Sequence, residues 1–123
     1  MVFEGLPAGP EGSPEAAVVE FFAAWSARDW DRVLEVTQRS WIVAHDDPVS
    51  SLRALLSAKP LEVKVLSYGA LNPVSYVVSA NLKRTIARGV SDTKSVRIVV
   101  VCEADPGIPV ETGDWGVNPV TVL

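Results

Sequence analysis

The spacing of apolar residues changes at Pro60, and this change constrains the fold more than any other feature of the chain. Before Pro60, four apolar residues recur at the i, i+3, i+4 and i+7 spacing of an amphipathic helix: Val18, Phe21, Phe22 and Trp25. After it, Leu61, Val63 and Val65 alternate with charged residues, which is the period of a β-strand. Helices followed by consecutive strands predict an α+β fold with helices packed on one face of an antiparallel sheet.

Helix start signals predict three helices in the first half of the chain. Ser13 can cap the first helix, and Pro14 suits its first helical position. Asp29 is expected to cap a second, shorter helix, and Asp47 a third that ends before Pro60. Turn residues then divide the second half into four predicted strands at 61–68, 74–86, 95–104 and 116–122.

The remaining segments are less regular. Trp41 and Ile42 are expected in a connection or a very short strand. Residues 1–12 are rich in Gly and Pro, so we expect a flexible N-terminal tail there and a single domain over 13–123. Pro119 restricts the last predicted strand to an edge or a bulge.

Charge and composition argue against several classes of partner. The net charge is −4, and the basic residues look scattered, Lys83 and Arg84 being the nearest pair. We therefore expect neither a nucleic-acid partner nor a membrane-surface partner. No apolar run is long enough to cross a bilayer. The single cysteine, Cys102, lies in an apolar run and reads as a buried, inert thiol, which favours a cytoplasmic location.

The first two predicted helices resemble the NTF2-like superfamily, which includes SnoaL-like and ketosteroid-isomerase-like proteins. The resemblance is carried by residues 18–33, VVEFFAAWSARDWDRV, where an aliphatic and an aromatic position precede Ala-Trp and an acidic break follows. It implies a cone in which the three N-terminal helices pack on the concave face of a curved, mostly antiparallel sheet. It also implies chemistry without metals or cofactors, and dimers formed through the outer sheet face. The apolar Val77, Val99 and Val101 on that face favour a homodimer.

The polar residues that could act in such a cavity are few. His45 beside Asp46 could serve as a general base, although a solvated loop is the simpler explanation of both residues. Arg84 shares strand parity with Val78 and Leu82, so it should point toward the concavity, where it could grip an anion. The simpler explanation is a side chain that extends to water at the strand end.

Two tyrosines, Tyr68 and Tyr76, could each bring a phenol into the cavity. No acid lies at an inward position of the predicted strands, because Glu62 and Glu103 fall on the polar parity, and this weakens an acid–base mechanism. Trp41 and Trp115 are candidates for the cavity rim. The predicted ligand-binding set comprises Phe22, Trp25, Trp41, Tyr68, Tyr76, Val78, Leu82 and Arg84.

Three functions remain open from the sequence. The first is a noncatalytic domain whose apolar cavity binds a small hydrophobic ligand. The second is a cofactor-free lyase, isomerase or hydrolase that uses His45, Asp46, Tyr76 or Arg84. The third is a protein-interaction module that uses the outer sheet face. The inward set of almost purely apolar residues favours the first.

Overall fold

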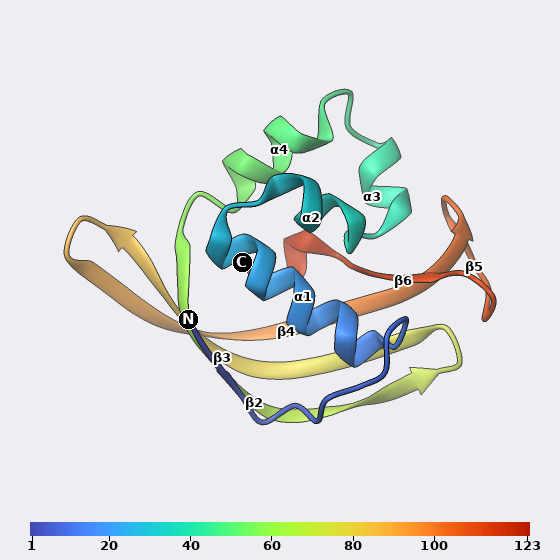
Figure 1. The fold of residues 1–123 in the computed structure, drawn as a ribbon, viewed down its shortest axis with the longest axis horizontal. Helices are drawn as coiled ribbons and strands as arrows, with labels where there is room; N and C mark the ends of the chain where they lie inside the picture. The colour runs from blue at the N-terminus through green and yellow to red at the C-terminus, as the bar shows by residue number, and fades with distance from the viewer.

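The structure is a computed structural model that describes residues 1–123, and a curved sheet of six strands dominates it (Figure 1). The strands are β1 (Val2–Glu4), β2 (Lys59–Asn72), β3 (Ser75–Ala87), β4 (Val90–Asp105), β5 (Ile108–Pro109) and β6 (Asp114–Val117). The helices are α1 (Pro14–Ala27), α2 (Trp30–Glu35), α3 (Arg39–Val43), α4 (Pro48–Leu55) and the 3-10 helix η1 (Pro119–Val122). None of these helices is both long and apolar enough to span a bilayer.

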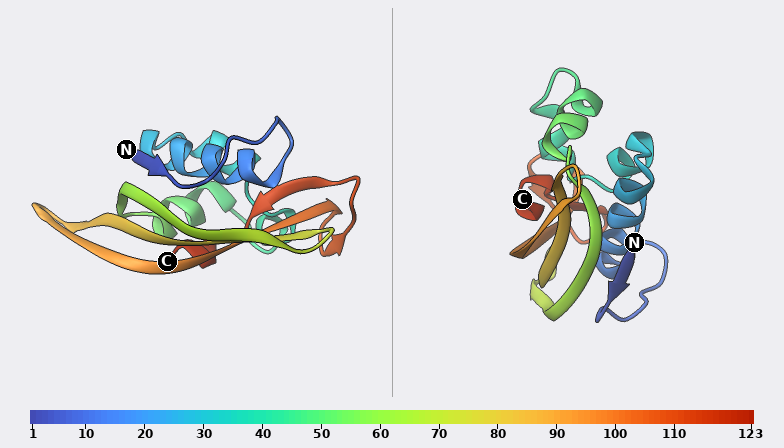
Figure 2. Two further views of the ribbon diagram at one scale, coloured as in Figure 1. Left: turned by 90° about the horizontal axis from the view of Figure 1, so that it is seen from below. Right: turned by 90° about the vertical axis from the view of Figure 1, so that its left-hand side faces the viewer.

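The strand order is β1-β2-β3-β4-β5, with β6 also paired to β4. All pairs are antiparallel except β1 with β2, which run parallel. The helices gather over one face of the sheet, as the two further views show (Figure 2). Register shifts near Pro60, Val65 and Ala70 interrupt the pairing of β2 with β3, and such bulges bend a sheet.

Helix α1 supplies the centre of the core. Ser13 caps it, its Oγ accepting a hydrogen bond from the Ala16 amide at 3.2 Å. The apolar stripe of α1 then packs on the inner faces of the long strands, and the Trp25 indole donates hydrogen bonds to the carbonyls of Leu56 and Ala58. Facing pairs on β3 and β4, Val78 with Ile98 among them, line that inner face. The core therefore forms between the apolar stripe of α1 and the inward-facing side chains of the strands, and both sets follow the spacing seen in the sequence.

The predicted architecture needs correction at the helices. Four α-helices are present rather than three, because Trp41 and Ile42 belong to the short helix α3 instead of a connection or strand. The chain also begins with a strand: Val2–Glu4 pair with β2 inside the segment expected to be a tail. The molecule is thus mostly sheet, and the expected arrangement of three N-terminal helices on a sheet is wrong.

Two strand predictions also change. The predicted strand 116–122 ends at Val117, and the chain turns into η1, because Asn118 caps the Val120 amide and Pro119 occupies the first helical position. Glu103, expected on a solvated face, is 1% exposed. Its carboxylate accepts hydrogen bonds from the Ser40 hydroxyl at 3.2 Å and the Gly107 amide at 2.6 Å, so α3 and the β4–β5 turn enclose it.

The outer face of the sheet is more polar than its valines suggested. Val77 is buried, whereas Val99 and Val101 are partly exposed. Their neighbours along β3 and β4 on this face are Ser79, Asn81, Ser95 and Arg97, among other polar residues. A homodimer through this face stays a prediction.

Candidate functional site

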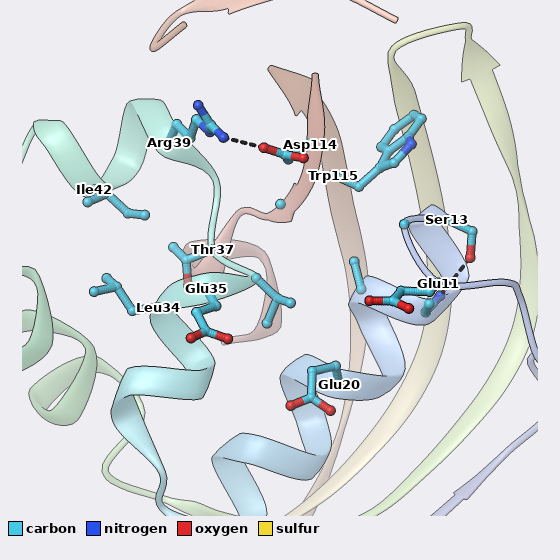
Figure 3. Close-up of a pocket in the computed structure, with 15 residues that line it drawn as sticks. Glu11, Ser13, Glu20, Leu34, Glu35, Thr37, Arg39, Ile42, Asp114 and Trp115 are labelled. Carbon is cyan, nitrogen blue, oxygen red and sulfur yellow. Dashed lines mark hydrogen bonds and ion pairs between the residues drawn. The ribbon is translucent and has the colours of Figure 1, made fainter. Parts of the chain in front are cut away.

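A groove of about 640 Å³ opens between α1, the α2–α3 segment and β6 (Figure 3). None of its lining residues comes from β2, β3 or β4, so it is not the cavity that the sequence predicted between the helices and the concave face of the sheet. Fifteen residues line it. They are Glu11, Gly12, Ser13, Ala16, Ala17, Glu20, Leu34, Glu35, Val36, Thr37, Arg39, Ile42, Asp114, Trp115 and Gly116. We call this site the α1–β6 groove.

The β6 side of the groove is fixed by backbone contacts with the α2–α3 connection. The Val117 amide donates to the Val36 carbonyl at 2.7 Å, and the Gln38 amide donates to the Val117 carbonyl at 2.9 Å. Gly116 lies between these bonds, and a Cβ on it would come within 2.7 Å of Gln38 Cα. The Thr37 side chain is buried and donates to the Val33 carbonyl at 2.7 Å. This wall is therefore preformed.

The apolar part of the lining comes from four elements and the residue that follows α2. Small alanines on α1 leave room for a ligand, and larger side chains on α2, α3 and β6 face them (Figure 3). The six apolar residues are Ala16, Ala17, Leu34, Val36, Ile42 and Trp115. Pockets of this kind bury the apolar body of a ligand, while a few polar groups orient it.

The charged residues that line the groove are four carboxylates and one guanidinium. Asp114 is ion-paired with Arg39, whose other nitrogen donates to the Ala104 carbonyl. Glu20 pairs with Arg32 at 2.8 Å, and its hydrogen bond and charge raise the pKa of Arg32. Glu11 and Glu35 make no ion pair. Two carboxylates of the groove therefore have no cationic partner, and the groove favours a positively charged ligand.

The geometry of these acids matters for the ligand type. They stand on different elements, Glu11 and Glu20 on the α1 side of the groove and Glu35 on the α2 side (Figure 3). They do not form a cluster of three metal-ligating side chains. Spread carboxylates around an apolar surface suit an organic ammonium or guanidinium group attached to an apolar body.

Four of the predicted ligand-binding residues are core residues. Phe22, Val78 and Leu82 are fully buried, and Trp25 is 1% exposed. They belong to one hydrophobic cluster and line neither the α1–β6 groove nor the second pocket, at the β3–β4 hairpin. The space between helices and sheet is filled here by side chains.

One of the two tyrosines, Tyr76, lies near Glu15, an acid that the sequence did not single out. Tyr76 is 6% exposed, and burial together with the neighbouring Glu15 carboxylate raises its pKa to about 12. Tyr68 is half exposed on the adjacent strand, its partner in the ladder being Val78. Glu15 comes from the first turn of α1, so strand parity gave no sign of it. Both tyrosines lie outside the α1–β6 groove.

The other polar candidates do not converge. The His45 ring stacks on Trp41 at 4.0 Å, and its Nδ1 lies 2.7 Å from the Trp41 carbonyl oxygen. Asp46, the next residue, is exposed. Arg84 does share the inner face, as its parity predicted, but its Nε is paired with Asp92 at 3.2 Å near the β3–β4 hairpin. Of the rim candidates, Trp115 lines the groove and Trp41 does not.

Comparison with known proteins bears on the fold alone. No protein-family model matches this chain, and no curated protein matches it. One similar solved structure is the solution structure of a SEC-C motif containing protein from Rhodopseudomonas palustris. The two chains are 20% identical, the match covers 87% of this chain and 76% of that one, and the TM-score is 0.67.

This likeness overturns the resemblance to the NTF2-like superfamily. The similar structure is a SEC-C motif protein, and no family model supports an NTF2-like, SnoaL-like or ketosteroid-isomerase-like assignment. The helix–break–helix motif of residues 18–33 is real as local structure, since α1 and α2 form there. A motif of that length specifies two packed helices, and many folds contain such a pair.

The α1–β6 groove was not predicted from the sequence. Its acids are far apart in the chain, from Glu11 to Asp114, and nothing in their local sequence links them. One usable signal was the Trp115-Gly116 pair, because a glycine beside a large aromatic residue marks a place where two backbones approach closely.

Proposed function

We propose that this protein is a noncatalytic binding domain whose α1–β6 groove takes a ligand with an apolar body and a cationic group. The observation that carries the proposal is the composition of the groove, four carboxylates and one guanidinium around six apolar residues. The noncatalytic part rests on the dispersal of His45, Arg84 and Tyr76 to separate places in the fold.

The ligand class follows from the two kinds of lining. Apolar surface contributes to binding in proportion to the area removed from water. The unpaired Glu11 and Glu35 add attraction for a cation, and this attraction is weakened by salt because Glu35 is exposed. An uncharged apolar ligand would leave these carboxylates without a partner. We therefore revise the expected small hydrophobic ligand to an amphipathic cation.

The protein-interaction function is compatible with the same groove. A Lys or Arg side chain on a partner presents an apolar stem and a cationic head, which is the chemistry the groove favours. A cytoplasmic location, which a lone buried cysteine favours, belongs to this proposal as well.

A matched pair of ligands tests the proposal. 4-Phenylbutylamine is protonated at neutral pH, and 4-phenylbutanol has the same apolar body without the charge. We expect the amine to bind with a Kd about fivefold below that of the alcohol at low salt, as one exposed charge pair is worth roughly 1 kcal/mol. Equal affinities, or no binding of either compound, would overturn the cationic-ligand assignment.

Two variants of α2 locate the effect. Glu35→Gln removes one unpaired carboxylate of the groove, and Asp31→Asn removes an exposed carboxylate of the same helix that lies outside the groove. The preference for the amine should fall in Glu35→Gln and persist in Asp31→Asn. If both variants lose it equally, the preference comes from the overall charge of the helices and not from the groove.

A further inference from the structure

The charges of this chain are segregated along the sequence. Residues 59–97 hold seven of the eleven Lys and Arg residues but two of the fifteen Asp and Glu residues. This segment therefore carries a formal charge of +5, and the remainder of the chain carries −9. The segment comprises β2, β3 and the first half of β4. The basic residues that look scattered in the sequence thus share one part of the sheet.

The most prominent part of this basic region is the tip of the β3–β4 hairpin, residues 83–94, which we call the arm. It extends past the helices at the end of the sheet away from α3 and β6 (Figures 1 and 2). Its Lys83, Arg88 and Lys94 are exposed and make no ion pair, whereas Arg84 pairs with Asp92.

The arm also carries apolar side chains where a partner could cover them. Ile86 is 54% exposed and Val90 50% exposed, although Ile86 has the same strand parity as the buried Val78 and Leu82. They flank the turn of Arg88 and Gly89, where Gly89 adopts a φ of 70° that favours glycine. Exposed branched residues beside a free guanidinium make the tip an amphipathic cation.

We propose that the arm of one molecule docks in the α1–β6 groove of a second copy. This inference rests on the proposed function and names the occupant of the same groove. The arm presents Arg88 between Ile86 and Val90, and the groove offers unpaired carboxylates around an apolar surface. The two surfaces are complementary in charge and in apolar character.

The arrangement in the fold makes this contact intermolecular. The groove is formed near the start of α1, by α3 and by β6, at the end of the molecule opposite the arm (Figure 1). An arm cannot therefore reach the groove of its own chain. Because the two contacting surfaces differ, the contact is head-to-tail, and it builds rings or open chains of molecules rather than an isologous dimer.

A second copy suits the charge distribution better than a polyanion such as a nucleic acid. A polyanion would be attracted by the segment of +5 but repelled by the remainder of −9. In a head-to-tail contact, the basic segment of one molecule lies against the acidic part of its neighbour. The net charge of −4 also disfavours binding to a phosphate backbone.

Sedimentation equilibrium on the full chain tests the contact. At about 0.5 mM protein and about 50 mM salt, the wild-type weight-average mass should exceed the 13.2 kDa of the monomer. At about 500 mM salt it should return toward the monomer mass, because exposed charges are screened. A wild-type mass of 13.2 kDa at low salt would overturn the inference.

A complementation experiment identifies the two surfaces. Arg88→Ser removes the charge of the arm tip and leaves the groove intact, whereas Glu35→Lys disables the groove and leaves the arm intact, and the neutral arm tip of the first variant is not attracted to the altered groove of the second. Each variant alone should be monomeric, and their equimolar mixture should form a one-to-one complex that grows no further. Arg53→Ser on α4 and Asp31→Lys on α2 are matched controls, since both residues are exposed and lie outside the two surfaces, and these controls should associate like wild type.

The outcomes separate this inference from the proposed function. If wild type associates but the mixture does not, another surface such as the outer sheet face mediates association, and the arm-in-groove contact is wrong. If wild type stays monomeric and its arm instead binds a single-stranded oligonucleotide through Arg88, the inference is also wrong. In either case 4-phenylbutylamine can still bind the groove, and the proposed function then stands without it.

Discussion

Gly116 and Gln38 approach so closely that a Cβ added to Gly116 would lie 2.7 Å from both the Cα and the amide nitrogen of Gln38. This contact joins β6 to the connection between α2 and α3. It sets the spacing of the wall of the α1–β6 groove, because Gly116 and Thr37 both line it. Any side chain at position 116 must displace backbone, which cannot yield by a rotamer change.

Gly116→Ala should therefore destabilise the protein and weaken ligand binding together. We expect the free energy of unfolding to fall by about 1–3 kcal/mol, the usual cost of overpacking a close contact. Gly69→Ala is the matched control, because a Cβ on Gly69 meets nothing within 4 Å. Denaturant unfolding of both variants checks the difference. Equal stability of Gly116→Ala and wild type would show that β6 can move freely against the α2–α3 connection.

Glu103 should act as a buried hydrogen-bond acceptor that holds α3 and the β4–β5 turn together. Glu103→Ala leaves the Ser40 hydroxyl and the Gly107 amide without their partner, and we expect a loss of about 1–3 kcal/mol in the free energy of unfolding. Glu103→Gln keeps an acceptor oxygen, so it should cost clearly less. Thermal unfolding measures both. The prediction fails if the glutamine variant is as unstable as the alanine variant.

Tyr76 should make the stability fall at alkaline pH. Its pKa rises from 10.0 to about 12 in the folded protein, with burial as the main cause. Between these values the unfolded chain loses the phenol proton while the folded protein keeps it, so the free energy of unfolding decreases as pH rises. The loss attributable to Tyr76 is at most about 2–3 kcal/mol.

A comparison of wild type with Tyr76→Phe isolates that contribution. The difference in free energy of unfolding between the two proteins should be constant below about pH 9 and should shift in favour of the phenylalanine variant toward pH 12. A difference that does not change with pH would mean that the Tyr76 phenol is solvated in the folded protein.

The Cys102 thiol should resist alkylation until the protein unfolds. The residue is fully buried in β4, and burial raises the pKa of the thiol, which keeps the reactive thiolate scarce. Incubation with iodoacetamide, followed by mass spectrometry, should show modification that tracks denaturant unfolding. Rapid labelling of the native protein would contradict the packing of β4 against β6.

Local features of this fold were predictable because local chemistry specifies them. Ser13, Asp29 and Asp47 each accept a hydrogen bond from an amide of the helix that follows, as expected of helix caps. The alternation along β3 placed Val78 and Leu82 on the correct face of the sheet, although they fill the core there and do not line a cavity. In these cases the signal and the structure it predicts lie within a few residues of each other.

The errors have a common physical origin in contacts between distant segments. Trp41 is helical because α3 is held against β4, through Ser40 to Glu103, and no local pattern reveals that contact. Ile86 shares the inward strand parity but is exposed, since β3 and β4 extend beyond the helices that cover the rest of the sheet (Figure 1). The groove joins residues from Glu11 to Asp114. Strand parity tells which face a residue occupies, and it does not tell what covers that face.

An NMR titration shows directly whether the α1–β6 groove binds an amphipathic cation. Amide shifts of the ¹⁵N-labelled protein are followed as 4-phenylbutylamine is added at low salt. We predict shifts at Ala16, Ala17, Thr37 and Gly116, with residues 75–82 of β3 unaffected, and a smaller effect of 4-phenylbutanol on the same amides. Shifts centred on the core side of β3, or no shifts at groove amides, would mean that the α1–β6 groove does not bind the amine.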